Sequence, residues 1–298
     1  VANTTGTQNV AVGSLALDAN TTASNNVAVG YGALTREDVG SANVAVGQGT
    51  LANQNTASAA NIYNTAVGHL AGAEVTTGTQ NTFIGGLAGD ANTTASNNEA
   101  VGYAALTANV TGTLNVAIGT FALGAYLSST STAVGYAALS LATGVENQAF
   151  GSRAMQNTTT GSENTAVGRS AMVSNTSGAF NVAVGKQALE NNTTAGYNTS
   201  VGYQALKTNT TGASNVAVGA ESGQALTSGA SNTLIGYQAG QYATTTTTGS
   251  GNTLVGAYSH TTAATSDYAN GIGYNIAAET NYTTVGQGVS DIRAAHGN

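Results

Sequence analysis

The unit Asn-x-Ala-Val-Gly recurs along the chain, and its regular spacing constrains the fold more than any other feature. With its glycine as position zero, the unit or a variant of it ends at Gly13, Gly30, Gly47, Gly68, Gly85, Gly102, Gly119, Gly135, Gly151, Gly168, Gly185, Gly202, Gly219, Gly236, Gly256, Gly273 and Gly286. Most successive glycines are 17 residues apart, while the spacing is 16 twice and rises to 21 and 20 at two insertions. A repeat this short is one supersecondary unit, which can bury its apolar face only against its neighbours. The period therefore predicts one elongated solenoid instead of the two domains that 298 residues would suggest.

The composition of the repeat indicates strands. Asparagine, threonine, glycine and valine dominate and helix formers are sparse, which favours β-structure. We predict an all-β fold, a parallel β-solenoid (β-roll) of about seventeen coils with 17 residues each. The last spacing falls to 13, so we expect the repeat array to cover residues 1–273 and an irregular coil with a cap or connector to cover residues 274–298.

The strand before each glycine is apolar on both faces. Position −1 is β-branched almost everywhere, as at Val184, and position −2 is mostly alanine, as at Ala183. Because side chains alternate along a strand, these positions lie on opposite faces. We expect the valine row to face the leucines at +4, such as Leu189, and the alanine row to allow close approach of two further copies of the chain. This predicts a homotrimer whose interface contains Ala28, Ala45, Ala117, Ala183 and Ala217.

The turns of the repeat are equally periodic. A glycine at position zero lets the chain turn with a positive φ, and an Asn-Thr-Thr segment often begins at +7, as in residues 192–194. Asparagine tolerates the left-handed conformation and bonds to its own backbone at turns. Stacking would align the asparagines at −4 into one amide ladder and those at +7 into another. The expected structural ladder includes Asn26, Gly30, Asn181, Gly185, Asn215 and Gly219.

Charge is scarce and scattered. Only 6% of the residues are charged, and the few lysines and arginines form no basic stripe, so no nucleic-acid partner is expected. The three histidines are far apart, and the carboxylates, Glu37 among them, lack the rhythm of calcium-binding repeats, which favours solvated charges. We therefore predict no enzyme, no cofactor and no metal site. No apolar run approaches the ~20 residues that span a bilayer, so membrane insertion is not expected.

Two insertions and one turn hold the candidate binding or modification residues. The insertions, within residues 53–63 and 241–251, are either tolerated length variation, which costs little free energy, or weak contact sites multiplied around a trimer. Asn-x-Thr/Ser sequons coincide with the +7 turn, which explains the asparagines without a glycan, while exposure of the turn leaves modification open. A cell-surface glycan is the expected ligand class, because the surface offers hydroxyls, amides and a few aromatic rings. The candidates are Tyr63, Tyr242, Asn92, Asn192 and Asn209.

The Asn-x-Ala-Val-Gly unit resembles the YadA-like head repeats of trimeric autotransporter adhesins, in which a related Asn-Ser-Val-Ala-Ile-Gly unit builds a parallel β-roll. The longer form here, with segments 202–206 (GYQAL) and 209–212 (NTTG), looks more like repeats of phage tail-fibre-type proteins. The tail 285–293 (VGQGVSDIR) looks like the segment that precedes an endosialidase-type intramolecular chaperone. The resemblance covers nearly the whole chain and implies a trimeric extracellular or virion rod, although the 17-residue period is longer than is usual in YadA-like heads.

These features predict a structural, non-enzymatic trimeric fibre, located outside the cell, on a cell surface or on a virion. Such an adhesin or tail-fibre-like rod would present or contribute to binding of a host or cell surface. The alternative is a repetitive subunit of an extracellular, glycosylated filament or matrix, with chains that associate end to end. A remote alternative is an ice-binding solenoid that uses the threonines at +8 and +9, although adjacent threonines in one turn point different ways.

Overall fold

The structure, a computed structural model, describes residues 3–125, 128–241, 246–287 and 292–296. These residues form strands, turns and bends without a helix, and most strands repeat with the predicted 17-residue spacing. The predicted fold class, an all-β parallel β-solenoid, is confirmed. The chain divides into two compact units, Val1–Glu146 and Asn147–Asn298, which are described separately.

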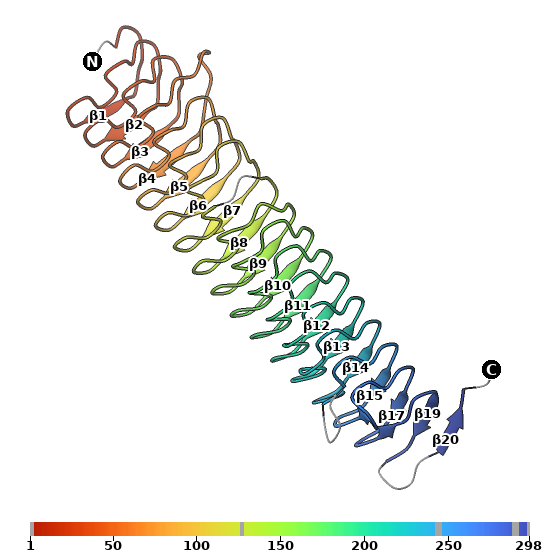
Figure 1. The fold of residues 1–298 in the computed structure, drawn as a ribbon. Helices are drawn as coiled ribbons and strands as arrows, with labels where there is room; N and C mark the ends of the chain where they lie inside the picture. Colours follow the sequence, from red (N-terminus) through yellow and green to blue (C-terminus); the bar gives the residue numbers. More distant parts are fainter. Residues whose placement is uncertain (1–2, 126–127, 242–245, 288–291, 297–298) are drawn as a thin grey trace. The chain divides into compact units, whose positions relative to one another are not determined.

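In the first unit, each turn of the solenoid contributes one three-residue strand to a parallel sheet (Figure 1). The strands are β1 (Val10–Val12), β2 (Val27–Val29), β3 (Val44–Val46), β4 (Thr65–Val67), β5 (Thr82–Ile84), β6 (Glu99–Val101), β7 (Val116–Ile118) and β8 (Thr132–Val134). Neighbouring strands pair with the same repeat positions opposite each other, as Ala100 pairs with Ala117. This register stacks equivalent side chains into rows along the unit.

The second unit has the same organisation. Its main parallel sheet contains β9 (Gln148–Phe150), β10 (Thr165–Val167), β11 (Val182–Val184), β12 (Thr199–Val201), β13 (Val216–Val218), β14 (Thr233–Ile235), β15 (Thr253–Val255), β17 (Asn270–Ile272) and β19 (Tyr282–Val285). A small second sheet pairs β16 (His260–Thr261) with β18 (Ala277–Ala278). Parallel pairing of β17 with β19 carries the stack past the boundary expected at residue 273, and β20 (Ile292–Ala295) then pairs antiparallel with β19.

The interior of a typical coil is formed by the small residue at −2 and the large residue at +4. Ala183 and Leu189 are both fully buried, whereas the β-branched residues at −1 lie on the outer face, where Ile118 is 39% exposed. The expectation that the valines face the leucines is therefore wrong, because the leucines fill the space beside the small alanines instead. Alanines that are 0% exposed in a single chain also cannot form the expected trimer interface. This correction applies to Ala28, Ala45, Ala117, Ala183 and Ala217.

At two places the large side chain stands at −2 and the small residue at +4. Phe83 occupies −2 in β5, and the +4 positions of its own coil and of the preceding coil are Gly89 and Gly72. A Cβ atom on Gly89 would lie 2.4 Å from Cε1 of Phe83, and one on Gly72 would lie 2.8 Å from Cδ2. Leu234 at −2 likewise lies against Gly223, whose added Cβ would be 2.7 Å from Cδ1 of the leucine. A bulky −2 side chain thus takes the volume that the +4 leucines fill elsewhere.

Hydrogen bonds between coils extend well beyond the strands. In the coil of β11, the backbone N–H groups of Val182, Leu189 and Asn191 donate to carbonyls of the following coil. Residues at +2, +4 and +12 have left-handed backbones, with φ values of 60° at Gln187, 53° at Leu189 and 61° at Tyr197. Because backbone N–H groups are used around so much of the coil, a proline would interrupt the stack at most positions, which agrees with the absence of proline.

Candidate binding surfaces

The asparagines at −4 form the expected amide ladder. The backbone N–H of Asn198 donates to Oδ1 of Asn181 at 2.9 Å, and the N–H of Asn181 donates to Oδ1 of Asn164 at 3.0 Å. Nδ2 of Asn181 also crosses its own coil to the carbonyl of Ala195, 2.9 Å away. Each such amide ties a strand both to its return turn and to the neighbouring coil. The other predicted ladder asparagines bond in the same way, and they are Asn26 and Asn215.

The ladder glycines bring neighbouring backbones close together. Gly30, Gly185 and Gly219 have φ values of 137°, 136° and 132°, which side-chain-bearing residues rarely adopt. A Cβ atom on Gly185 would lie 2.3 Å from the carbonyl oxygen of Gly202. These positions therefore serve the stacking of coils and present no side chain to a ligand.

The asparagines at +7 belong to the interior of the return turn. Nδ2 of Asn192 donates to the carbonyl of Ala195 at 3.0 Å and to Oδ1 of Asn175 at 2.9 Å. The candidate modification residues Asn92, Asn192 and Asn209 are all 0% exposed. These three side chains are therefore not available for the expected modification, because the turn folds them into the coil where a glycan has no room.

The threonines at +8 use their hydroxyl groups inside the stack. Oγ1 of Thr176 donates to the carbonyl of Thr193 at 2.9 Å, and Oγ1 of Thr193 donates to the carbonyl of Thr210 at 3.1 Å. Thr210 continues this ladder to Thr227 at 3.0 Å. The ice-binding alternative depends on two regular threonine rows, and one of them is committed to bonds between coils.

The outer face of each parallel sheet is partly exposed and has a continuous apolar row at −1, while its −3 row mixes valine with polar residues, among them Glu99 and Gln148. We call it the valine face and define it as positions −3 and −1 of the parallel strands. The residues at −3 are mostly half-buried valines and threonines. Several residues at −1 are between 37% and 41% exposed, and they are Val67, Ile84, Ile118, Phe150, Val167, Val218 and Ile235. An apolar row that continues from strand to strand is larger than the scattered apolar residues usual on protein surfaces.

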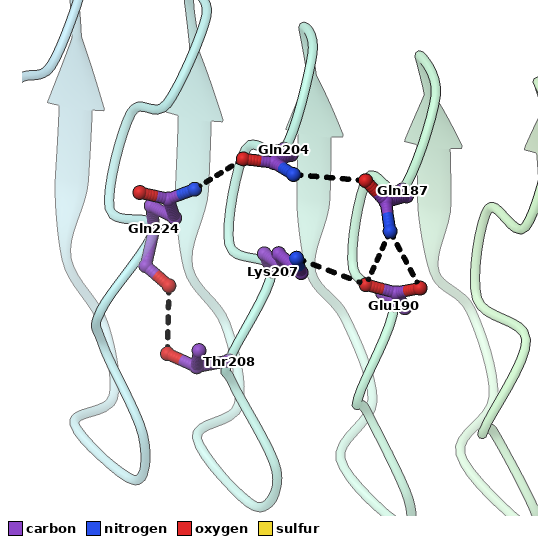
Figure 2. A network of polar contacts seen from close by, with 6 residues as sticks. All are labelled: Gln187, Glu190, Gln204, Lys207, Thr208 and Gln224. Carbon is purple, nitrogen blue, oxygen red and sulfur yellow. Dashed lines mark hydrogen bonds and ion pairs between the residues drawn. The ribbon is translucent and has the colours of Figure 1, made fainter.

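A ladder of polar side chains runs along positions +2 and +5 of the second unit (Figure 2). Nε2 of Gln204 donates to Oε1 of Gln187 at 2.8 Å, and Gln224 in turn donates to Gln204. Gln187 donates to both carboxylate oxygens of Glu190, at 2.9 and 3.0 Å, and Nζ of Lys207 lies 3.5 Å from the same carboxylate. Such amide ladders stabilise stacked strands, so the amides are engaged with one another and not turned toward a ligand.

Aromatic side chains form clusters in both units, and in the second unit Phe180 and Tyr197 also stack, with centroids 5.0 Å apart. In the first unit, the ring of Phe121 lies edge to face with those of Tyr103 and Tyr136, with centroids 5.7 and 6.4 Å away. The tyrosines stand at +1 and are 51% and 53% exposed, so they point outward. The equivalent cluster of the second unit, with centroid distances of 5.3 and 5.6 Å, contains Tyr237, Tyr258 and Tyr274.

The two candidate tyrosines of the insertions have different outcomes. Tyr63 is 56% exposed, and its hydroxyl accepts a hydrogen bond from Nδ2 of Asn61 at 3.0 Å. It occupies the same repeat position as Tyr197, which is 65% exposed in a coil without an insertion. The exposure of Tyr63 is therefore not special to the insertion. Tyr242 lies outside the described residues.

Glu37 is a buried carboxylate that the sequence interpretation placed among solvated charges. It stands at +7, where many coils have asparagine, and it is 0% exposed. Its carboxylate accepts hydrogen bonds from the N–H of Gly40 at 2.7 Å, Nε2 of Gln54 at 3.0 Å and Oγ1 of Thr56 at 3.1 Å. The sequence feature that could have indicated its burial is its place at +7, a position that the return turn buries.

Metal-binding clusters and membrane-spanning helices are both absent from the described part of the chain. No group of three or more His, Cys, Asp or Glu side chains is arranged there to hold a metal ion. No helix with the length and apolar character needed to cross a bilayer occurs among the same residues. In comparisons with known proteins, no family model, curated protein or solved structure matches the chain. The resemblance to YadA-like heads and tail-fibre repeats therefore stays a prediction.

Proposed function

We propose that this protein is a structural, non-enzymatic fibre, a homotrimeric rod outside the cell or on a virion that contributes to binding of a cell surface. The observation that supports this function is the valine face. The alanine row lies inside the coil, so the valine face replaces it as the proposed contact between copies.

The repeat itself favours a second copy of the chain as the partner of the valine face. Its side-chain rows advance by one strand spacing per coil, about 4.8 Å. Another copy has the same spacing and can therefore bury the row coil by coil, whereas an unrelated globular partner would cover only part of it. We propose three copies because the repeats resemble those of trimeric adhesin heads and tail fibres.

The proposed location follows from the surface composition. Only 6% of the residues are charged, and because most asparagines are buried, the polar part of the outer surface comes largely from threonine, serine and glycine. A neutral polar surface of this kind is commoner on secreted and virion proteins than on cytoplasmic enzymes.

Light scattering in solution tests the assembly. We expect a mass of three times 29.1 kDa, or about 87 kDa, for the unmodified chain. Ile118→Lys would place a charge on the valine face and should lower the mass toward that of one chain, because unpaired charges are costly to bury between copies. Leu141→Lys is the matched control, since Leu141 is 50% exposed at +6, outside the strand.

A single-chain mass for the unmodified protein would contradict the proposal. So would an Ile118→Lys variant that assembles as well as the Leu141→Lys control. Circular dichroism of both variants shows whether the solenoid itself is intact, because a β-rich spectrum does not depend on assembly.

A further inference from the structure

A hollow lies on the surface of the first unit, outside the valine face. Its volume is about 350 Å³, near the lower end of the 300–1,000 Å³ range that is typical of ligand pockets. Its lining comes from successive coils and includes Leu15, Tyr31, Gly32, Arg36, Gln48 and Leu70. Nothing in the repeat pattern requires a hollow here.

The hollow exists because two successive coils lack a side chain at +2. Gly32 and Gly49 occupy this position, while Leu15 and Leu70 occupy it in the coils on either side. A Cβ atom on Gly49 would lie 2.6 Å from Cδ2 of Leu70, so this leucine leans over Gly49. A Cβ atom on Gly32 would meet nothing closer than Oγ1 of Thr35 at 3.5 Å. The empty space therefore lies over Gly32, with apolar walls.

Polar groups surround this apolar floor. Tyr31 and Gln48 stand at +1 of the two glycine-containing coils, and Arg36 stands at +6. Asn53 also lines the hollow, but its Nδ2 already donates to Glu74 at 2.9 Å. Among the described residues, the guanidinium of Arg36 has no ion-pair partner. The groups open to a ligand are thus a guanidinium, an amide and a phenol.

We propose that the hollow binds a carboxylated sugar, a uronic acid unit of an acidic glycan. The guanidinium of Arg36 would bind the carboxylate in a bidentate manner. The apolar face of the sugar ring would lie against Leu15 and Tyr31, and its hydroxyls would bond to the amide of Gln48. A neutral sugar would leave the arginine without a counter-charge. The inference rests on the proposed fibre function, to which it adds a ligand class and a binding site.

Calorimetric titration of the full chain with a hyaluronan tetrasaccharide, which alternates glucuronate with N-acetylglucosamine, tests the inference. The carboxyl-reduced form of the same tetrasaccharide is the neutral counterpart. We expect the acidic form to bind at least about tenfold more tightly than the reduced form, as is usual for hydrogen bonds to charged groups. Arg36→Gln should remove this difference, and Arg153→Gln, which alters an exposed arginine of the second unit, should keep it.

Gly32→Gln tests the hollow itself. The φ of Gly32 is 65°, close to the 60° of Gln187, which stands at the same repeat position, so a glutamine fits the backbone and fills the space. Binding should be lost in this variant while its thermal unfolding stays near that of the unmodified chain. The inference is overturned if the unmodified chain does not bind the acidic form, if both forms bind equally, or if folded Gly32→Gln binds normally. Light scattering on the same samples is read separately: a binding monomer contradicts only the trimer, and a trimer that does not bind contradicts only this site.

Discussion

At the scale of single residues, the coil depends on backbone conformations that most amino acids avoid. Leu189 is fully buried at +4 although its φ is 53°. The left-handed conformation costs about 1–2 kcal/mol for an L-residue, while burial of a leucine side chain stabilises by about 1.5–3 kcal/mol. The interior contact therefore offsets the strain of the turn, and the hydrogen bonds to neighbouring coils hold the conformation in place.

At position zero, no side chain can offset the backbone strain in this way, so the position requires glycine. Gly185→Ala combines a φ of 136° with a Cβ only 2.3 Å from the carbonyl of Gly202, so we expect it to lower the free energy of unfolding by about 3 kcal/mol or more. Gly32→Ala is the control, because its φ of 65° and its nearest contact of 3.5 Å should limit the loss to about 1 kcal/mol. Chemical denaturation measures both values. If both variants lose the same free energy of unfolding, the close carbonyl of the next coil is not the reason that position zero requires glycine.

At the scale of the coil, interior volume is shared between positions −2 and +4. Phe83→Ala should lower the free energy of unfolding by about 3–5 kcal/mol, because glycines stand at +4 in its own coil and in the preceding coil and cannot fill the cavity. Adding Gly72→Leu and Gly89→Leu to that variant should recover most of the loss, since both glycines have φ values near 57°, as the +4 leucines do. In the unmodified background, Gly89→Leu alone should destabilise by overpacking against Phe83. Urea titration measures the free energy of unfolding of the unmodified chain and the three variants. A triple variant no more stable than Phe83→Ala would refute the claim that positions −2 and +4 share one interior volume.

The period, the strands, the turns and the −4 amide ladder could all be predicted from the sequence. Their chemistry is local: glycine marks a backbone that only glycine adopts, and asparagine marks a turn. The burial of the +7 asparagines was not predicted, because the turn was expected to be exposed. Alternation could not predict which strand face points into the coil, because positions −1 and −2 are both apolar. The deciding signal was the coincidence of Phe83 at −2 with Gly72 and Gly89 at +4, which places both positions in one interior. The hollow was missed because consecutive glycines at +2 are informative only once that position is known to face outward.

At the scale of the whole molecule, each unit is a stack of nearly equivalent coils, so each feature of one coil becomes a row. A single half-exposed valine is unremarkable on a protein surface, but a row of them offers a second copy of the chain, which has the same repeat, a matching surface. We therefore infer that the valine face is a contact between copies of this chain.

Cross-linking through single cysteines tests this claim most directly, because the chain contains no cysteine of its own. Val218→Cys places a thiol on the valine face, and Asn191→Cys places one at the exposed +6 position of a nearby coil. With a short bismaleimide at low protein concentration, Val218→Cys should give covalently joined chains, and Asn191→Cys should react without joining chains. If Val218→Cys instead reacts fully and remains a single chain, the valine face is not an interface between copies.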